Sequence, residues 1–309
     1  MRPLILLLAL ATPAAAQQQR APFTIAETGQ GFQHLDAAVT AVRDGTATIL
    51  IAPGTYRECT VQTGGKITFR AVKPGTAIFE REVCEDKAAF VLRGRGSVVD
   101  GIVFRGYAVP DGNGAGIRIE MGDLTVTNAM FLDSQEGILG GGHATVRHIT
   151  IDRSTFSGLG QCETENCSHA LYLAVDGLVT ITRSRFERGT GGHYVKLRAR
   201  QVAITGNSFD DSQGQKTNYM IDLSEGGTGI IAGNTFVQGR GKENSSALIA
   251  VAAEGRTYPA AGLRIEGNRA TLAPGAPGNP AFVADLSGER LALGENQLGP
   301  GIRAFERRR

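Results

Sequence analysis

The chain has 309 residues, with 42 glycines, no tryptophan and a formal net charge of +2 at pH 7. Its length allows one large core or two smaller ones, and its glycine content favours a turn-rich, repetitive backbone over a helical globule. Four arginines lie at the termini (Arg2 and Arg307 to Arg309), so the body carries a formal charge of −2 and a nucleic-acid footprint is not expected.

The first residues have the pattern of a secretory signal peptide. A short basic start precedes the apolar run "LILLLAL", and "ATPAAAQ" places small residues at Ala14 and Ala16, where signal peptidase cuts. We expect a leader over residues 1–16, a mature chain from Gln17 and a periplasmic or secreted protein. No apolar run reaches the ~18 residues of a membrane span, so no transmembrane segment is expected.

Export makes the four cysteines candidates for disulfides. We favour Cys59–Cys84, which are separated by about one repeat length, and Cys162–Cys167, which would close the loop "QCETENCSHA". A zinc site is the alternative, but the uneven spacing of the cysteines and an oxidising compartment disfavour it.

An amphipathic helix is predicted next, in "GFQHLDAAVTAVRDG". Apolar side chains recur there at helical spacing, at Phe32, Leu35, Ala38, Val39 and Val42. The strand and turn of "ATILIAPGTYRE" follow. We expect the helix to cover the open end of a stacked β-structure.

Internal repeats predict the fold. Short β-rich runs end in phenylalanines spaced 23 to 30 residues apart, namely Phe104, Phe131, Phe156, Phe186, Phe209 and Phe236. A second run in each unit alternates apolar with polar or small residues. One such unit cannot bury its apolar face, whereas stacked units form a parallel solenoid, and a propeller would need about four strands in ~40–50 residues. The repeats are clearest over residues 90–270, and we assign residues 17–309 to one all-β domain.

At this point the sequence resembles the pectate-lyase-like superfamily of right-handed parallel β-helices, in which a capping helix leads into a strand and turn like "ILIAPGTYRE". The resemblance covers about residues 23–300 and implies the fold, because lyases, hydrolases, epimerases and binding proteins share this scaffold. The runs "GHYVKLRA" and "NYMIDL" are also similar to those of a bacterial family of exported β-helix proteins.

Aligning the second runs of four coils separates inward from outward positions. Two aliphatic columns must face the core: Leu171, Val195, Ile221 and Ile249, and Leu173, Leu197, Leu223 and Val251. The predicted outward positions hold Tyr172, Tyr194, Lys196, Arg198 and Asp222. Because neighbouring coils lie ~4.8 Å apart, these side chains should form one patch. Its expected margin contains Arg200, Glu225 and Glu254.

Two further columns are interpreted structurally. The alternation places His169, His193 and Tyr219 inward near the strand start, as stacked polar groups at a coil corner. The two histidines stay candidates for substrate binding rather than catalysis. The glycine-preceded asparagines fit a hydrogen-bonded ladder at a turn, and these are Asn207, Asn234 and Asn268.

The outward patch contains the groups that β-elimination from a uronic-acid polysaccharide requires. Arg198 suits the substrate carboxylate, Lys196 is the candidate base, and Tyr172 or Tyr194 is the candidate proton donor. Asp222 would orient Lys196. The patch resembles the Lys-plus-Arg sites of alginate and chondroitin lyases, which carry the two residues on successive coils, whereas here they share one strand.

Other interpretations of the patch stay open. A salt-bridge ladder, with each pair contributing ~0–1 kcal/mol, needs no function, and a glycan-binding or envelope-structural β-helix needs no chemistry. A hydrolase is disfavoured because the outward positions hold Asp222 without a second carboxylate beside it. No cofactor is expected, although calcium at Asp210 and Asp211, or at Asp222 and Glu225, is an alternative.

Overall fold

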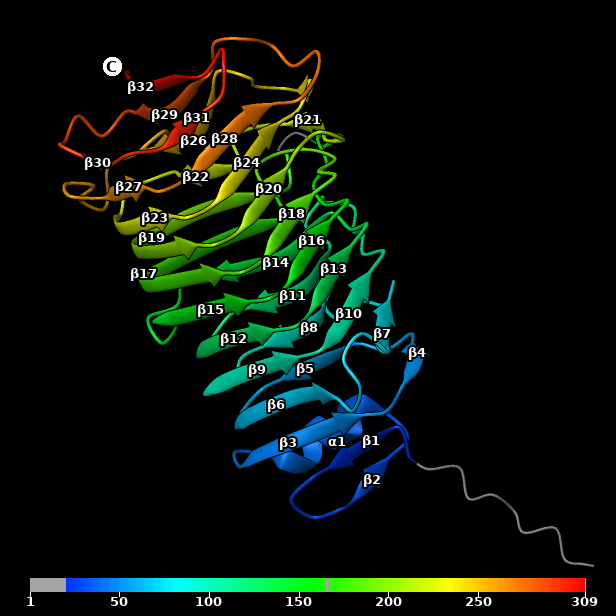
Figure 1. The fold of residues 1–309 in the computed structure, drawn as a ribbon. Helices are drawn as coiled ribbons and strands as arrows, with labels where there is room; N and C mark the ends of the chain where they lie inside the picture. Colours follow the sequence, from blue (N-terminus) through cyan, green and yellow to red (C-terminus); the bar gives the residue numbers. More distant parts are fainter. Residues whose placement is uncertain (1–20, 165–166, 309) are drawn as a thin grey trace, which may run out of the picture.

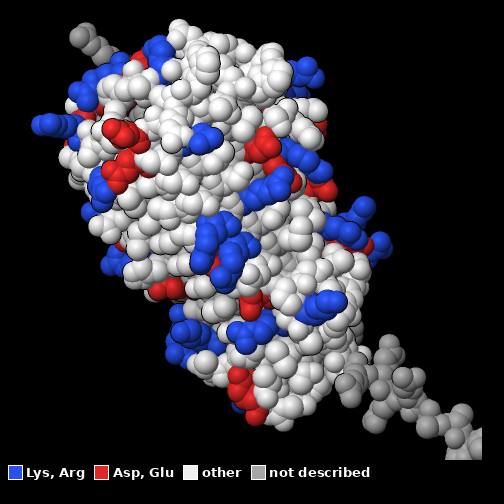
Figure 2. Space-filling model, in the orientation of Figure 1, with Lys and Arg blue, Asp and Glu red and all other residues white. Residues whose placement is uncertain are grey.

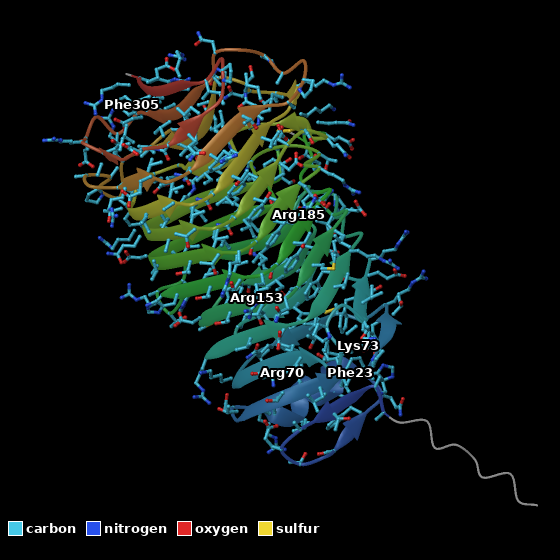
Figure 3. All side chains as sticks on the ribbon, in the orientation of Figure 1. Phe23, Arg70, Lys73, Arg153, Arg185 and Phe305 are labelled. Atoms are coloured by element: carbon cyan, nitrogen blue, oxygen red, sulfur yellow. A yellow bond between two sulfur atoms is a disulfide. The ribbon has the colours of Figure 1, made fainter. Side chains whose placement is uncertain are left out.

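The computed structural model describes residues 21–164 and 167–308. This part of the chain winds into a right-handed parallel β-helix whose coils stack in sequence order (Figure 1), which confirms the predicted fold class. Phe23 lies near one end of the stack and Phe305 near the other (Figure 3). The predicted leader lies outside the described residues, and the single domain over residues 17–309 stays a prediction.

One ladder of short parallel strands carries the recurrent phenylalanines. It contains β4 (Gly54–Tyr56), β7 (Ala77–Glu80), β10 (Ile102–Arg105), β13 (Met130–Leu132), β16 (Thr155–Ser157), β18 (Arg185–Glu187), β20 (Ser208–Asp210), β24 (Thr235–Gln238), β28 (Arg269–Leu272) and β31 (Gln297–Leu298). The six predicted rings stack directly, with centroids 4.8–5.1 Å apart and planes inclined by 5–10°. Parallel strands in register place equivalent side chains above one another, so one buried ring per coil builds a continuous core.

The larger sheet forms two faces of each coil. The face that bears the outward patch contains β5 (Thr60–Gln62), β8 (Ala88–Leu92), β11 (Ala115–Ile119), β14 (Glu136–Gly141), β22 (Ile221–Leu223), β26 (Ala247–Val251), β29 (Ala281–Asp285) and β32 (Arg303–Arg307). The adjoining face contains β3 (Thr46–Ile51), β6 (Lys66–Ala71), β9 (Gly96–Asp100), β12 (Asp123–Thr127), β15 (His148–Asp152), β23 (Thr228–Ala232), β27 (Arg264–Glu266) and β30 (Ala292–Leu293). Two long strands run across both faces, namely β17 (Leu171–Thr182) and β19 (Val195–Thr205).

A ladder of asparagine side chains stabilises one turn of the coils, as predicted. Nδ2 of Asn207 donates to Oδ1 of Asn234, and Nδ2 of Asn234 to Oδ1 of Asn268, each at 3.0 Å. Asn296 extends the ladder by one coil. These buried amides also bond backbone groups of neighbouring coils, so their role is structural.

The N-terminal part contains the predicted helix, α1 (Leu35–Val42), together with the antiparallel strands β1 (Phe23–Ile25) and β2 (Gly31–Phe32). Leu35, Ala38 and Val39 are buried in the main core, whereas Phe32 lies in β2. The helix lies at the N-terminal end of the stack (Figure 1), and its role as a cap stays a prediction. A small pair of strands, β21 (Gln215–Thr217) and β25 (Gly241–Lys242), lies outside the main ladders.

Charged side chains are mixed on the surface. On the face drawn in Figure 2, lysines and arginines lie in small groups beside aspartates and glutamates, without a continuous basic stripe. Within the described ranges, no helix is long and apolar enough to cross a membrane.

Candidate functional site

The strand register confirms the predicted Tyr172–Lys196–Asp222 column of the patch. Tyr172 pairs with Lys196 and Lys196 pairs with Asp222, so the three side chains lie on successive coils. All eight residues of the two inward columns are fully buried, with 0% exposure. They are Leu171, Leu173, Val195, Leu197, Ile221, Leu223, Ile249 and Val251. This alternation forces Lys196 and Arg198 to the opposite, outward side of the sheet.

A cavity of about 710 Å³ lies over this outward face. Residues of the β-helix strands line it together with the loop residues Pro110, Asp111, Asn113, Thr164 and Cys167. Seven side chains bring charge or rings to it, namely Asp111, Glu136, His169, Tyr172, Lys196, Arg198 and Glu254. The cavity therefore combines two cations, three carboxyl groups and two aromatic rings.

Lys196 is held in a fixed position at the base of the cavity. Its side chain is only 9% exposed, and Nζ contacts a carboxylate oxygen of Glu254 from a coil two turns further along. Oδ2 of Asp222 lies 3.9 Å from Nζ, and the centre of the Tyr172 ring lies 5.4 Å away. The Lys196 ammonium group thus lies between two carboxyl groups and the face of the Tyr172 ring.

Arg198 connects three side chains of the site. Its Nε donates a hydrogen bond to the Tyr172 hydroxyl at 2.9 Å, and one terminal nitrogen donates to Glu254 at 2.5 Å. The other terminal nitrogen contacts Glu225. Glu225 and Glu254 therefore lie beside the patch, as predicted. Both belong to later coils than Arg198, and their carboxylates contact its guanidinium.

Arg200 lies apart from this cavity. It pairs with Asp176, with Nε 2.7 Å from Oδ1, and its guanidinium stacks over the Tyr258 ring at 5.2 Å. Arg200 does not line the cavity, and its predicted part in substrate binding stays a prediction.

Asp222 is a buried carboxyl group beneath the cavity. It is 1% exposed, and its Oδ2 accepts a hydrogen bond from Ser224 at 2.6 Å. Among the residues that the structure describes, its Oδ1 has no hydrogen-bond partner. Burial raises the pKa of Asp222 to about 6, against the opposing effects of the Ser224 hydroxyl and Lys196. This group titrates between mildly acidic and neutral pH.

The two histidines face outward, and the prediction that they point inward is wrong. Their rings stack with each other at 4.9 Å, Tyr219 stacks on His193 at 5.5 Å, and His169 lines the cavity. Nδ1 of His169 accepts the backbone N–H of His193 at 3.0 Å, so a neutral His169 ring carries its proton on Nε2. Burial, with the Lys196 and Arg198 charges, lowers the pKa of His169 to about 3. His169 is therefore a neutral hydrogen-bond donor across the working pH range.

Tyr194 has the opposite orientation, so its predicted place in the outward patch is wrong. The side chain is 2% exposed, and its hydroxyl donates to Asp211 at 2.8 Å and accepts the Gly189 N–H at 3.0 Å. Strand β19 begins at Val195, and the backbone bends just before it, so two consecutive side chains point into the core. The same corner buries Met220 beside Ile221, Leu248 beside Ile249 and Ala170 beside Leu171.

Glu136 is a cavity residue that the sequence analysis missed. It begins β14, is 1% exposed and lies one coil before His169, two residues ahead of the paired positions Ile138 and Leu171. Extending the histidine column by one coil would have found it. Instead, the glycine-rich run "EGILGG" hid the alternation on which the alignment depended.

Both predicted disulfides are present, Cys59–Cys84 and Cys162–Cys167. They involve all four cysteines, so the zinc alternative is excluded. The second disulfide lies beside the site, because Cys167 lines the cavity.

The acids considered for calcium are occupied by protein groups. Asp211 is buried and bonded to Tyr194, Thr217 and the Gly239 amide, with Lys242 Nζ 3.4 Å away. Asp210 lies at the end of β20 rather than in a turn. In residues 21–164 and 167–308, no group of three or more His, Cys, Asp or Glu side chains is arranged to hold a metal ion. A calcium requirement stays a matter for experiment.

Comparison with solved structures identifies similar folds. The PL6 family alginate lyase AlyGC matches with a TM-score of 0.53 and 16% sequence identity, over 82% of this chain and 36% of the lyase. A mutant of that lyase matches with a TM-score of 0.47 at 16% identity and the same coverage of 82% and 36%. ORF18 of Geobacillus virus E2 matches with a TM-score of 0.48 at 13% identity, over 88% of this chain and 56% of that one.

The likeness to AlyGC concerns the fold alone, and this chain spans about a third of the length of that lyase (36%). No protein-family model and no curated protein matches the sequence.

Proposed function

We propose that this protein is a polysaccharide lyase that cleaves an acidic, uronic-acid-containing glycan by β-elimination in the cavity over Tyr172, Lys196 and Arg198. The observation that carries the proposal is the meeting of an amine, a guanidinium and a phenol on one wall of a cavity of about 710 Å³. Arg198 Nε lies 2.9 Å from the Tyr172 hydroxyl, and Lys196 Nζ lies 5.4 Å from the centre of the Tyr172 ring.

The three groups match the three demands of the reaction. β-Elimination breaks the C5–H and C4–O4 bonds of a uronate and forms a C4=C5 double bond. Arg198 binds the carboxylate and stabilises the negative charge that develops when C5 loses its proton. The neutral amine of Lys196 accepts that proton, and the Tyr172 hydroxyl protonates the departing O4 and is later reprotonated by water. His169 contributes a further hydrogen bond through Nε2–H.

Lys196 must lose a proton before it can act as the base. Glu254 contacts Nζ, and Oδ2 of Asp222 lies 3.9 Å from it. A substrate carboxylate that replaces Glu254 on Arg198 would remove the nearer partner, because one Glu254 carboxylate contacts both cations.

The fold and the disulfides support the proposed substrate class and an oxidising compartment. The β-helix is similar in fold to a PL6 alginate lyase, which favours an acidic polysaccharide as the substrate class. Two disulfides suit an oxidising compartment such as the periplasm or the extracellular space, where such glycans occur.

A second candidate function is glycan binding without chemistry. One observation favours it: both cations of the site are already paired, Lys196 with Glu254 and Arg198 with Glu225 and Glu254. A site of this kind retains a protonated lysine and recognises an acidic glycan through its charges alone.

A panel experiment separates the two functions. Mature protein is incubated with alginate, polygalacturonate, glucuronan and chondroitin sulfate, with calcium and with a chelator, and the ultraviolet absorbance of unsaturated uronates is followed. Affinity electrophoresis with the same polymers measures binding independently. The lyase predicts an unsaturated product from at least one polymer, whereas binding without any product would favour the second function. If no polymer of the panel is bound and none yields product, the lyase and the glycan-binding function are both contradicted.

A further inference from the structure

Glu136 is a buried carboxyl group at the wall of the cavity. Its side chain lines the cavity although the residue is only 1% exposed, and its Oε2 has no hydrogen-bond partner within the described part of the chain. It stands one coil before His169 on the same outward face, and the backbone N–H of His169 is directed at its carboxyl group. Buried polar atoms are nearly always hydrogen-bonded, so the unpartnered Oε2 requires an explanation, and a ligand in the adjacent cavity could supply its partner.

The surroundings of Glu136 do not provide a counter-ion for a carboxylate. The charged groups that face it are Arg118 of β11, Asp111 of the neighbouring loop and Lys196 of β19, and the His169 ring beside it is neutral. Arg118 is paired with Glu120, Lys196 lies beside Asp222 and Glu254, and the charge on Asp111 is repulsive. Burial is the largest effect and raises the pKa of Glu136 well above its ordinary value.

We infer that Glu136 is present as a neutral carboxylic acid and donates a hydrogen bond from Oε2–H to a carboxylate of an acidic ligand in the cavity. The identity of the ligand as a uronic-acid glycan rests on the proposed function, whereas the neutral donor rests on the position of Glu136 alone. A hydrogen bond to an ionised acceptor is stronger than one between neutral groups.

This arrangement divides the cavity into two parts. Glu136 and His169 present neutral donors from one column, and Lys196 and Arg198 present positive charges from β19, one coil after His169. An ionised Glu136 would repel an anionic glycan, whereas the protonated form binds it without adding a charge. Uronate units of one glycan would thus be recognised in two ways, by charge at Arg198 and by neutral hydrogen bonds at Glu136.

The protonation state is tested by ¹³C NMR of protein labelled at the glutamate carboxyl carbons. The signal that disappears in Glu136→Gln identifies this residue. We expect its shift to be that of a carboxylic acid at pH 7, while the exposed glutamates are ionised. A carboxylate shift at pH 7 would overturn the inference, whatever the protein does with glycans.

The donor role is tested by calorimetric titration with a uronic-acid tetrasaccharide and its carboxyl-reduced, neutral analogue. Glu136→Gln keeps a neutral donor and should bind the acidic tetrasaccharide within a few-fold of the wild type, whereas Glu136→Leu should bind it roughly 10- to 100-fold more weakly. Asp111→Asn is the matched control, since the same exchange on an exposed cavity carboxylate removes a repulsive charge and should strengthen binding.

The pH dependence gives an independent check. Affinity of the wild type should decrease as the pH rises through the pKa of Glu136, and this part of the decrease should be absent in Glu136→Gln. Equal loss in the Gln and Leu variants, or no binding of any uronic tetrasaccharide, would overturn the donor role. Binding that follows the prediction without any turnover would keep this inference and contradict the lyase.

Discussion

Nε of Arg198 donates a hydrogen bond to the hydroxyl of Tyr172 across one coil of the β-helix, at 2.9 Å. This bond holds the phenol beside the guanidinium that would bind a substrate carboxylate, and it does not use the phenolic proton because the hydroxyl oxygen is the acceptor. The two residues are 26 positions apart in sequence, and the parallel register of β17 and β19 brings them together. The proposed roles of both residues depend on this contact.

The two tyrosines near the patch give a matched pair of variants. Tyr172→Phe should lower kcat roughly 10²- to 10⁴-fold, because it removes the proposed proton donor from the cavity. Tyr194→Phe should leave kcat unchanged and lower the free energy of unfolding by about 1–3 kcal/mol, because buried Asp211 loses a hydrogen-bond donor. Steady-state kinetics and urea unfolding of both variants measure these effects, and a large loss of kcat in Tyr194→Phe would contradict the assignment.

Glu254 is expected to compete with the substrate carboxylate. Its carboxylate contacts Lys196 and Arg198 together, and its side chain is 39% exposed. Glu254→Gln should therefore tighten the binding of uronic oligosaccharides several-fold, corresponding to about 1 kcal/mol for a partly exposed pair. Glu225→Gln is the control, because Glu225 pairs with Arg198 but does not line the cavity. Weaker binding by Glu254→Gln would show that this carboxylate assists the ligand instead.

The raised pKa of Asp222 predicts that the free energy of unfolding depends on pH. Its pKa is raised from 3.8 to about 6, so the folded protein binds a proton more tightly than the unfolded chain. This contribution is complete below pH 3.8 and is lost as the pH rises through 6, with a limit of about 3 kcal/mol. Urea unfolding of wild type and Asp222→Asn between pH 4 and 7, roughly the titration range, should show this loss only in the wild type. If the free energy of unfolding depends on pH in the same way in both proteins, the loss of stability is due to other groups.

The phenylalanine stack predicts where the fold is most sensitive to truncation. The ring of Phe156 lies 4.9 Å from Phe131 and 4.8 Å from Phe186, with 0% exposure. Phe156→Ala should lower the free energy of unfolding by about 3–5 kcal/mol through lost burial and a cavity. Phe305→Ala, at a partly buried site on the last strand, should cost clearly less, and thermal or urea unfolding compares them. Equal losses would argue against a continuous ring core.

Much of the scaffold follows from local repetition in the sequence. The phenylalanine column, the asparagine ladder and the Tyr172–Lys196–Asp222 column were predictable, because each depends on residues that recur once per coil. The Cys59–Cys84 disulfide also joins residues about one coil apart, whereas Cys162–Cys167 was predictable because the two cysteines are only five positions apart. Parallel strands keep such residues in register, so a correct alignment of coils is already a prediction of contacts.

The site was less predictable, because it depends on where the regular alternation breaks. Tyr194 and Val195 both point inward at the corner before β19, and this exchanges the expected orientations of Tyr194 and His193. Glu136 was hidden for a related reason. In its coil, Gly140 occupies the position equivalent to Leu173, with φ at +126° and no space for a side chain beside Ile119. The long-range contact of Lys196 with Glu254 spans 58 residues and has no local signal.

The central claim, β-elimination with Lys196 as the base, is tested most directly by product analysis of wild type and Lys196→Ala on the glycan of the panel that binds best. Ultraviolet absorbance and mass spectrometry identify unsaturated ends, and circular dichroism verifies that both proteins keep the β-fold. The wild type should produce unsaturated uronates, and Lys196→Ala should lose at least about 10²-fold in rate while remaining folded. A folded wild type that binds the glycan without forming this product, or a Lys196→Ala variant that retains its rate, would contradict the account.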